Sequence, residues 1–171
     1  MKTIRKFMIS VMAGAAALCA TSCLEDTPLV DWDDLGVVIE LPYNSHYLAA
    51  QEVEPGETLT FDLMVNYTVS EVSMVTEDIP VTLDVDLSMV DEYNKTSTTQ
   101  YECFPEGTYD FPLTLTIKKG SRLAEQTMTV NVGDEFEPGH AYMLPLVITN
   151  VPEGYIASGN FGHLYLRILM K

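Results

Sequence analysis

The sequence predicts an all-β protein, an antiparallel β-sandwich of about seven strands with one short helical turn. Three observations lead to this prediction. Apolar and polar residues alternate with a period of two in several segments. Turn signals that contain Pro and Gly separate those segments, and no long segment after residue 22 has the roughly 3.6-residue period of a helix.

The alternation is clearest in residues 58–69, where Leu59 and Phe61 begin an apolar face and Thr60 and Asp62 begin a polar one. This pattern is typical of a half-buried strand, because successive side chains of a strand point to opposite faces. The other expected strands are Gly36–Leu41, Pro80–Ser88, Phe111–Lys118, Leu123–Val132, a segment with Tyr142, Leu144, Leu146 and Ile148 on one face, and His163–Met170.

The one expected helix follows Pro80–Ser88. Ser88 and Asp91 have the spacing of a capping box, with Asp in the place of the usual Glu. This spacing predicts one or two helical turns that continue through Asn94.

Tyr142 lies three residues after the Pro138-Gly139 turn. The arrangement resembles the tyrosine corner of fibronectin-type and immunoglobulin-like domains, in which the ring fills the sandwich corner and the hydroxyl caps a backbone group upstream. Leu144 stands where antibody domains have a cysteine, so an antibody-like domain is excluded. Pro145 lies on the opposite face and predicts either an edge strand or a local break in the hydrogen-bond ladder.

The first 22 residues have the organisation of a secretory signal peptide. A basic head that ends at Lys6 precedes the apolar run Phe7–Ala20, and the small residues Thr21 and Ser22 come directly before Cys23. The alternative is an N-terminal transmembrane anchor, but the apolar run is shorter than the ~20 residues that a membrane-spanning helix needs.

Thr21, Ser22 and Cys23 resemble a bacterial lipobox, in which the cysteine thiol takes a diacylglycerol and the new amino terminus is acylated. Several acyl chains together give stable anchoring. Glu25 and Asp26 resemble the surface-export signal of Bacteroidetes lipoproteins. These resemblances imply a lipid-anchored outer-membrane protein that faces the exterior. The alternative is that Glu25 and Asp26 form only a solvated tether.

The chain is strongly acidic. Its net charge is −16, and removal of residues 1–22 takes away three basic and no acidic residues, which leaves 6 basic against 25 acidic residues, a charge of −19. Nucleic acid and anionic lipid headgroups need clustered Lys and Arg, so the charge argues against both as partners. Cys103 is the one thiol left besides Cys23, so no internal disulfide is expected. Without a basic neighbour, Cys103 is expected to be a buried or half-buried packing residue.

The chain therefore divides into a lipoprotein signal peptide at 1–22, an acidic tether at 23–34 and a single β-sandwich domain at 35–171. Trp32 is the only tryptophan and lies in the tether. Two interpretations of Trp32 stay open, namely stacking against a sugar and folding back onto the domain.

A set of residues between 83 and 170 has an order and spacing that are specific when taken together. The set consists of Val85, Asp86, Tyr93, Asn94, Tyr101, Pro105, Tyr109, Ile117, Gly120 and the run Tyr142–Pro145. It resembles the lipoprotein domain of unknown function from gut Bacteroidetes that is often placed N-terminal to sugar-binding or glycoside hydrolase modules. The resemblance implies a β-sandwich, surface display and association with polysaccharide utilisation, and it implies no catalytic residues.

Candidate binding residues fall into two groups. A glycine-rich loop is expected at 151–162, and loops on a rigid sandwich often carry recognition. The alternative for both groups is that their rings only cover loop ends. The loop group is Tyr155, Asn160 and Phe161, and the second aromatic and polar group is Tyr93, Asn94 and Tyr101.

No catalytic residue, metal site or cofactor is expected. His46, His140 and His163 lack the spacing of zinc ligands, and the acidic pair Asp84 and Asp86 lacks the pattern of an EF-hand. No nucleophile motif occurs, and no feature indicates the two opposed carboxylates of a glycosidase.

The sequence thus predicts a non-enzymatic surface lipoprotein, an accessory in glycan binding or polysaccharide utilisation. Its expected partners are the membrane, through the lipid anchor, and polysaccharide or other surface proteins. The alternative is a structural or adhesive, pilus-like subunit assembled by strand exchange.

Overall fold

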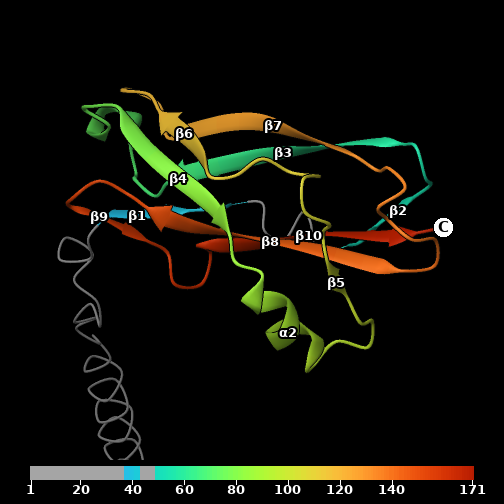
Figure 1. Cartoon of the computed structure of the whole chain (residues 1–171). Helices are drawn as coiled ribbons and strands as arrows, with labels where there is room; N and C mark the ends of the chain where they lie inside the picture. The colour runs from blue at the N-terminus through green and yellow to red at the C-terminus, as the bar shows by residue number, and fades with distance from the viewer. Residues whose placement is uncertain (1–36, 43–48) are drawn as a thin grey trace, which may run out of the picture. The chain divides into compact units, whose positions relative to one another are not determined.

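The computed structural model describes residues 37–42 and 49–171 (Figure 1). The predicted signal peptide, Cys23, Glu25, Asp26, Trp32 and His46 lie outside these residues. The described chain forms two β-sheets that share one apolar core, with a short helix, α2 (Ser88–Asn94), and a 3-10 turn, η1 (Val72–Met74). The predicted all-β sandwich is confirmed. Neither helix is long and apolar enough to cross a membrane.

The first sheet has four strands in the order β7-β3-β1-β9. Their bounds are Leu123–Asn131 for β7, Thr58–Tyr67 for β3, Val37–Glu40 for β1 and Tyr155–Ala157 for β9. β3 and β7 pair antiparallel without a break, from Thr58 opposite Asn131 to Asn66 opposite Leu123. We call this sheet A.

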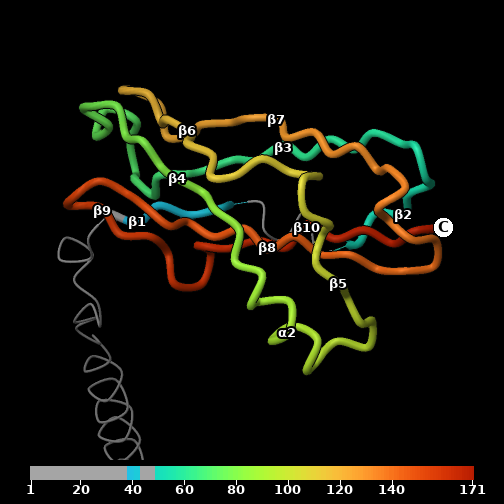
Figure 2. Tube along the Cα trace, viewed as in Figure 1, coloured from blue at the N-terminus to red at the C-terminus, as the bar shows by residue number. Residues whose placement is uncertain are grey.

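The second sheet, sheet B, has six strands. Five follow the order β2-β10-β8-β4-β6, and β5 pairs with β8. Although β6 and β7 are consecutive, they belong to different sheets, and the chain passes from one sheet to the other between them (Figure 2). The bounds are Gln51–Val53 for β2, His163–Met170 for β10, Ala141–Asn150 for β8, Ile79–Val85 for β4, Leu113–Ile117 for β6 and Glu102–Cys103 for β5.

The strands of four or more residues are the seven that the alternation predicts, and they pair with one another antiparallel. The structure adds three short strands, β2, β5 and β9, each of which pairs in parallel with a long strand. β9 corrects the prediction of a loop throughout 151–162. These strands have only two or three residues, too few for a period of two to be recognised.

The helix α2 is present as predicted, but its cap differs from the predicted box. The Ser88 side chain caps no backbone N–H of its own helix. The Oδ1 atom of Asp86 instead accepts hydrogen bonds from the Ser88 N–H at 3.1 Å and from the Ser88 hydroxyl at 2.5 Å. The carboxylate two residues upstream therefore holds the start of the helix.

Pro145 breaks a ladder inside the sheet rather than marking an edge. β8 lies between β10 on one side and β4 and β5 on the other. The β4 ladder ends where the Asp86 N–H donates to the Pro145 carbonyl at 3.2 Å, and β5 reaches only as far as Met143. The missing N–H of Pro145 falls in the gap between these two partners, so no ladder hydrogen bond is lost.

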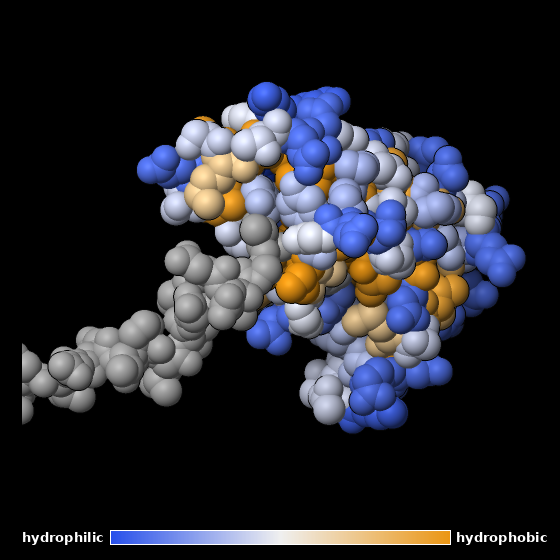
Figure 3. All heavy atoms as spheres, turned by 90° about the vertical axis from the view of Figure 1, so that its left-hand side faces the viewer, coloured by the Kyte–Doolittle hydropathy of each residue, from blue (hydrophilic) through white to orange (hydrophobic). Residues whose placement is uncertain are grey.

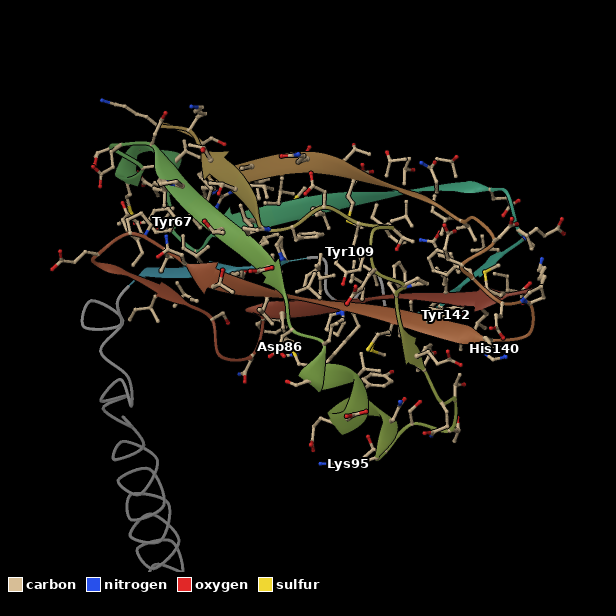
Figure 4. All side chains as sticks on the ribbon, in the orientation of Figure 1. Tyr67, Asp86, Lys95, Tyr109, His140 and Tyr142 are labelled. Atoms are coloured by element: carbon tan, nitrogen blue, oxygen red, sulfur yellow. The ribbon has the colours of Figure 1, made fainter. Side chains whose placement is uncertain are left out.

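The Tyr142 side chain closes one corner of the sandwich, at the right-hand end in Figure 4. It is 3% exposed, and its ring meets the Phe136 ring edge-on at 5.0 Å. Its hydroxyl accepts a hydrogen bond from the Glu137 N–H at 2.9 Å, which is the upstream cap expected of a tyrosine corner. The predicted corner is confirmed.

The two ends of the sandwich carry different parts of the chain. β1 begins at the left-hand end in Figure 1, beside β9, and β10 runs to the right-hand end, where the C-terminus lies. β9 runs parallel to β1, so the loop after β9 lies beside the residues that follow β1, where the Phe161 carbonyl accepts from the Leu41 N–H.

Two Tyr142 variants separate the packing of the ring from the hydrogen bond of its hydroxyl. Tyr142→Ala is expected to lower the free energy of unfolding by ~3–5 kcal/mol, because a large buried ring is lost. Tyr142→Phe keeps the ring and loses one hydrogen bond, so it should cost about 1 kcal/mol. Urea unfolding of both variants measures the difference, and an unchanged midpoint for Tyr142→Ala would show that the ring does not support the corner.

Candidate functional site

Tyr155, the first predicted binding residue, is engaged within the fold. Its hydroxyl donates a hydrogen bond to Oε1 of Glu77 at 3.2 Å, and its ring lies 5.5 Å from the ring of Tyr67. Burial and then the Glu77 hydrogen bond raise the pKa of Tyr155. The ring therefore packs against the end of β3 and the hydroxyl reaches the segment before β4, so neither stands free for a ligand.

Asn160 and Phe161 are exposed in the turn between β9 and β10, and Phe161 keeps 47% of its surface accessible. The backbone of Phe161 is fixed, because its carbonyl accepts from the Leu41 N–H at 2.7 Å and its N–H donates to the Ser158 hydroxyl at 3.0 Å. This turn thus presents one aromatic ring and one amide on a held backbone.

Other apolar side chains are exposed at the end of the sandwich where β1 begins, the left-hand end in Figure 1. They include Val72 and Met74 of η1 and Ile156 of β9. Figure 3 views this end and shows apolar patches separated by polar atoms. Such scattered exposure is normal for a soluble surface and does not by itself indicate a binding site.

The second predicted group, Tyr93, Asn94 and Tyr101, is brought together beside sheet B. Three residues of β10 complete the group, because His163, Tyr165 and Arg167 alternate along β10 on the outer face of the sheet. We call the side chains of Tyr93, Tyr101, His163, Tyr165 and Arg167 the aromatic cluster.

Arg167 lies at the centre of the aromatic cluster and is only 9% exposed. Its Nη1 donates to the Tyr93 hydroxyl at 2.6 Å. Its guanidinium carbon lies 5.6 Å from the centre of the Tyr93 ring and 5.8 Å from that of Tyr101. Ring faces attract a cation most strongly when it is desolvated, so Arg167 ties α2 and the segment before β5 to β10.

Asn94 and Tyr101 serve the fold through their polar groups. The Asn94 amide donates to the Tyr101 carbonyl at 2.8 Å and accepts from the Tyr101 N–H at 2.9 Å. The Tyr101 side chain is buried against Val90 and Met143. The rings that keep part of their surface accessible are therefore those of Tyr93, Tyr165 and His163.

These three rings lie in a row. The Tyr93 and Tyr165 centres are 5.0 Å apart with planes at 56°, and the Tyr165 and His163 centres are 5.4 Å apart with planes at 69°. Burial, followed by the electrostatic effects of Tyr93, Asp86 and Glu92, raises the pKa of Tyr165. Two carboxylates therefore act on the row from the α2 side, and Figure 4 places Asp86 where β4 meets α2.

Sequence reasoning found Tyr93 and missed Tyr165, His163 and Arg167. A signal existed, because the period of two in residues 163–170 puts His163, Tyr165 and Arg167 on one face. What the sequence lacked was the pairing that puts this face beside α2. The structure also corrects the prediction for Cys103, which is exposed in the two-residue strand β5 rather than buried.

Two kinds of reactive group can be checked in the described residues, a thiol and a metal cluster. Partial burial and then the Asp91 charge raise the pKa of the Cys103 thiol, which disfavours the reactive thiolate. No group of three or more side chains able to hold a metal ion comes together in residues 37–42 and 49–171. The arrangement of the aromatic cluster is suited to binding by ring contact and hydrogen bonds.

Comparison with known proteins identifies the family. Residues 34–154 match the model of a protein family described as a "-like, N-terminal domain". The chain belongs to this family. No curated protein matches it.

Three solved structures with a similar fold come from Bacteroides, and their chains are longer. A two-domain protein of unknown function from Bacteroides fragilis has a TM-score of 0.64 at 14% identity over 81% of this chain and 47% of its own. A proposed carbohydrate-binding protein from Bacteroides ovatus has a TM-score of 0.56 at 20% identity over 77% of this chain and 36% of its own.

A third is an endoglycosidase from Bacteroides thetaiotamicron with a Man5GlcNAc product, with a TM-score of 0.53 at 19% identity over 78% of this chain and 30% of its own. The chain thus spans less than half the length of these relatives. The predicted resemblance to a Bacteroidetes domain placed before sugar-related modules is confirmed.

The tyrosines make the stability of the folded protein depend on pH in the alkaline range. The pKa values of Tyr67, Tyr109, Tyr155 and Tyr165 are all raised, in each case first by burial. The folded state then holds these protons more tightly than the unfolded state, whose tyrosines titrate near pH ~10. The free energy of unfolding should be fully retained below this pH and fall as the pH rises through and above it.

Urea unfolding between about pH 8 and about pH 11 measures this fall. Tyr165→Phe should make the decline shallower, because one of the four groups is removed. A flat profile in the unchanged protein would contradict the expectation.

Proposed function

We propose that this chain is a non-enzymatic, lipid-anchored surface domain that contributes to glycan capture, and that the aromatic cluster is the surface that meets the glycan. The observation that carries the proposal is the row of Tyr93, Tyr165 and His163, whose neighbouring ring centres are 5.0 and 5.4 Å apart. Aromatic rings with polar tips offer an apolar face to sugar C–H groups and hydrogen bonds to sugar hydroxyls.

The tilt between the rings limits which glycans fit. Planes at 56° and 69° do not form one flat platform. A flat crystalline polysaccharide would therefore touch a single ring, whereas a soluble, flexible chain can turn one or two sugar units toward successive rings. The proposal accordingly favours soluble oligosaccharides or polysaccharides.

The charges near the aromatic cluster also limit which glycans can bind. The carboxylates of Asp86 and Glu92 act on Tyr165 and can accept hydrogen bonds from sugar hydroxyls. The chain carries a net charge of −16, which repels acidic polysaccharides. Neutral glycans are the expected class.

The similarity to solved structures supports the proposal independently of the aromatic cluster. Structural neighbours include a proposed carbohydrate-binding protein and an endoglycosidase with a glycan product. Their similarity to this chain is in fold, and the ring row of this chain supplies the residues through which a glycan role would act.

The two candidate surfaces serve as controls for each other in a binding experiment. A panel of neutral oligosaccharides should bind the chain weakly, and Tyr165→Ala should reduce affinity about tenfold, since stacking on a ring is worth roughly 1–2 kcal/mol. Phe161→Ala, in the turn after β9, should leave affinity unchanged. Isothermal titration calorimetry measures both, after thermal melting shows that each variant is folded.

The reverse pattern, with binding lost in Phe161→Ala and kept in Tyr165→Ala, would move the site to the turn after β9. Absence of binding across neutral glycans would remove the glycan proposal.

The lipid anchor and the export signal can be tested apart. Cys23→Ala should abolish incorporation of labelled palmitate and release the chain from membranes, because the acylated thiol is gone. Replacing both Glu25 and Asp26 with Ala should keep the label but protect the chain from protease added to intact cells. Palmitate labelling in Cys23→Ala would show that another residue is acylated.

A further inference from the structure

The open edge of β7 is the longest unpaired strand edge in the described part of the chain. β7 runs for nine residues along one edge of sheet A and pairs only with β3 (Figure 1). Natural proteins blunt such edges with Pro, Lys, bulges or short strands. β7 contains no Pro, Lys or Arg, and its register with β3 has no shift.

The hydrogen bonds at the two ends of β7 show which backbone groups are unused. The Arg122 carbonyl accepts from the Tyr67 N–H, and Val132 both donates to the Glu57 carbonyl and accepts from the Gly56 N–H. Even-numbered residues therefore turn toward β3. Because these groups alternate in direction along an unbroken strand, odd-numbered residues turn their N–H and C=O groups to the open edge. They are Glu125, Thr127 and Thr129 in the middle of the strand, and Leu123 and Asn131 at its ends. The two end residues already have partners, because the Ser121 hydroxyl bonds both the N–H and the C=O of Leu123 and the Gly133 N–H donates to the Asn131 carbonyl.

We propose that this edge pairs antiparallel with β7 of a second copy, about a two-fold axis that passes through Thr127. In this register Thr127 lies opposite Thr127 of the other copy, and Glu125 lies opposite Thr129. The three facing pairs that Glu125, Thr127 and Thr129 form exchange their outward N–H and C=O groups, so sheet A continues from one copy into the next.

The edge sequence is complementary to itself in this register. Glu125 is the only charged residue of β7, and the pairing sets it against a threonine hydroxyl rather than against another carboxylate. A recess of about 420 Å³ borders the middle of the strand and is lined by Asp62, Met64, Glu125, Gln126 and Thr127. This recess lies over β3 and β7, and the side chains of Glu125 and Thr127 are exposed beside it.

The pairing is independent of the proposed glycan surface, which lies on sheet B. It also gives a structural basis to the sequence-derived alternative of a subunit that assembles through strands. The charge of −16 on each copy opposes association, so added salt should strengthen the pair.

Cysteine cross-linking of the full membrane-anchored chain tests the register. The background is Cys103→Ser, because Cys103 is exposed. Thr127→Cys should give a disulfide-linked dimer under mild oxidation, since facing residues of this kind lie ~5.5 Å apart between Cα atoms, within disulfide range. Thr129→Cys is the matched control, on the same strand and face. Its two copies would be roughly 13 Å apart, so about tenfold less dimer is expected.

Thr127→Pro provides a second measurement without cysteine chemistry. It removes an outward N–H that β3 does not use and the hydrogen bond of the Thr127 hydroxyl to Asp62 at 2.8 Å. The melting temperature should therefore fall modestly, whereas the dimer fraction of the detergent-solubilised chain in light scattering should fall about tenfold. Equal cross-linking at both positions, none at Thr127, or an unchanged dimer fraction in a folded Thr127→Pro variant would each overturn the proposal.

Discussion

The burial of β8 on both of its faces is the constraint on which the rest of the structure depends. Tyr142, Leu144 and Leu146 face the core between the sheets, and Met143 and Pro145 face the opposite way yet are also buried. Antiparallel sheets commonly have one face exposed to solvent, whereas strands that are buried on both faces have near-continuous apolar sequences. α2 and Tyr101, which precedes β5, cover the outer side of β8, whereas β5 itself pairs beside β8 within sheet B.

This second layer determines where the aromatic cluster lies. α2 has seven residues and is too short to be stable alone, so its position comes from packing of Val90 and Tyr93 against sheet B. Where α2 meets β10, the Arg167 guanidinium lies against the ring faces of Tyr93 and Tyr101 and donates to the Tyr93 hydroxyl. The hydrogen bond from Arg167 to the Tyr93 hydroxyl links β10 to α2 on the same side as the contact between Tyr93 and Tyr165.

Sequence patterns predicted the parts of the fold that repeat over many residues. The long strands, α2 and the Tyr142 corner follow from alternation, spacing and turn chemistry, each of which is local. The short strands were missed because their stability comes from a neighbouring strand. Within the site, Tyr93 and Tyr165 come from α2 and β10, and only strand order brings them together. The glycine-rich segment made Tyr155 a candidate for binding. Its hydrogen-bond partner, Glu77, is far away in the sequence, so no local pattern could show that the hydroxyl is already engaged.

The placement of the two ends of the sandwich has a mechanical consequence. β1 begins at one end and β10 finishes at the other, so a pull applied between them acts along the strands. Ladder hydrogen bonds that lie across the direction of force are loaded together in shear, and many must break at once. β1 is secured on both sides, by β3 and β9, and β10 by β8 and β2. The domain is thus built to transmit tension lengthwise without unzipping strand by strand.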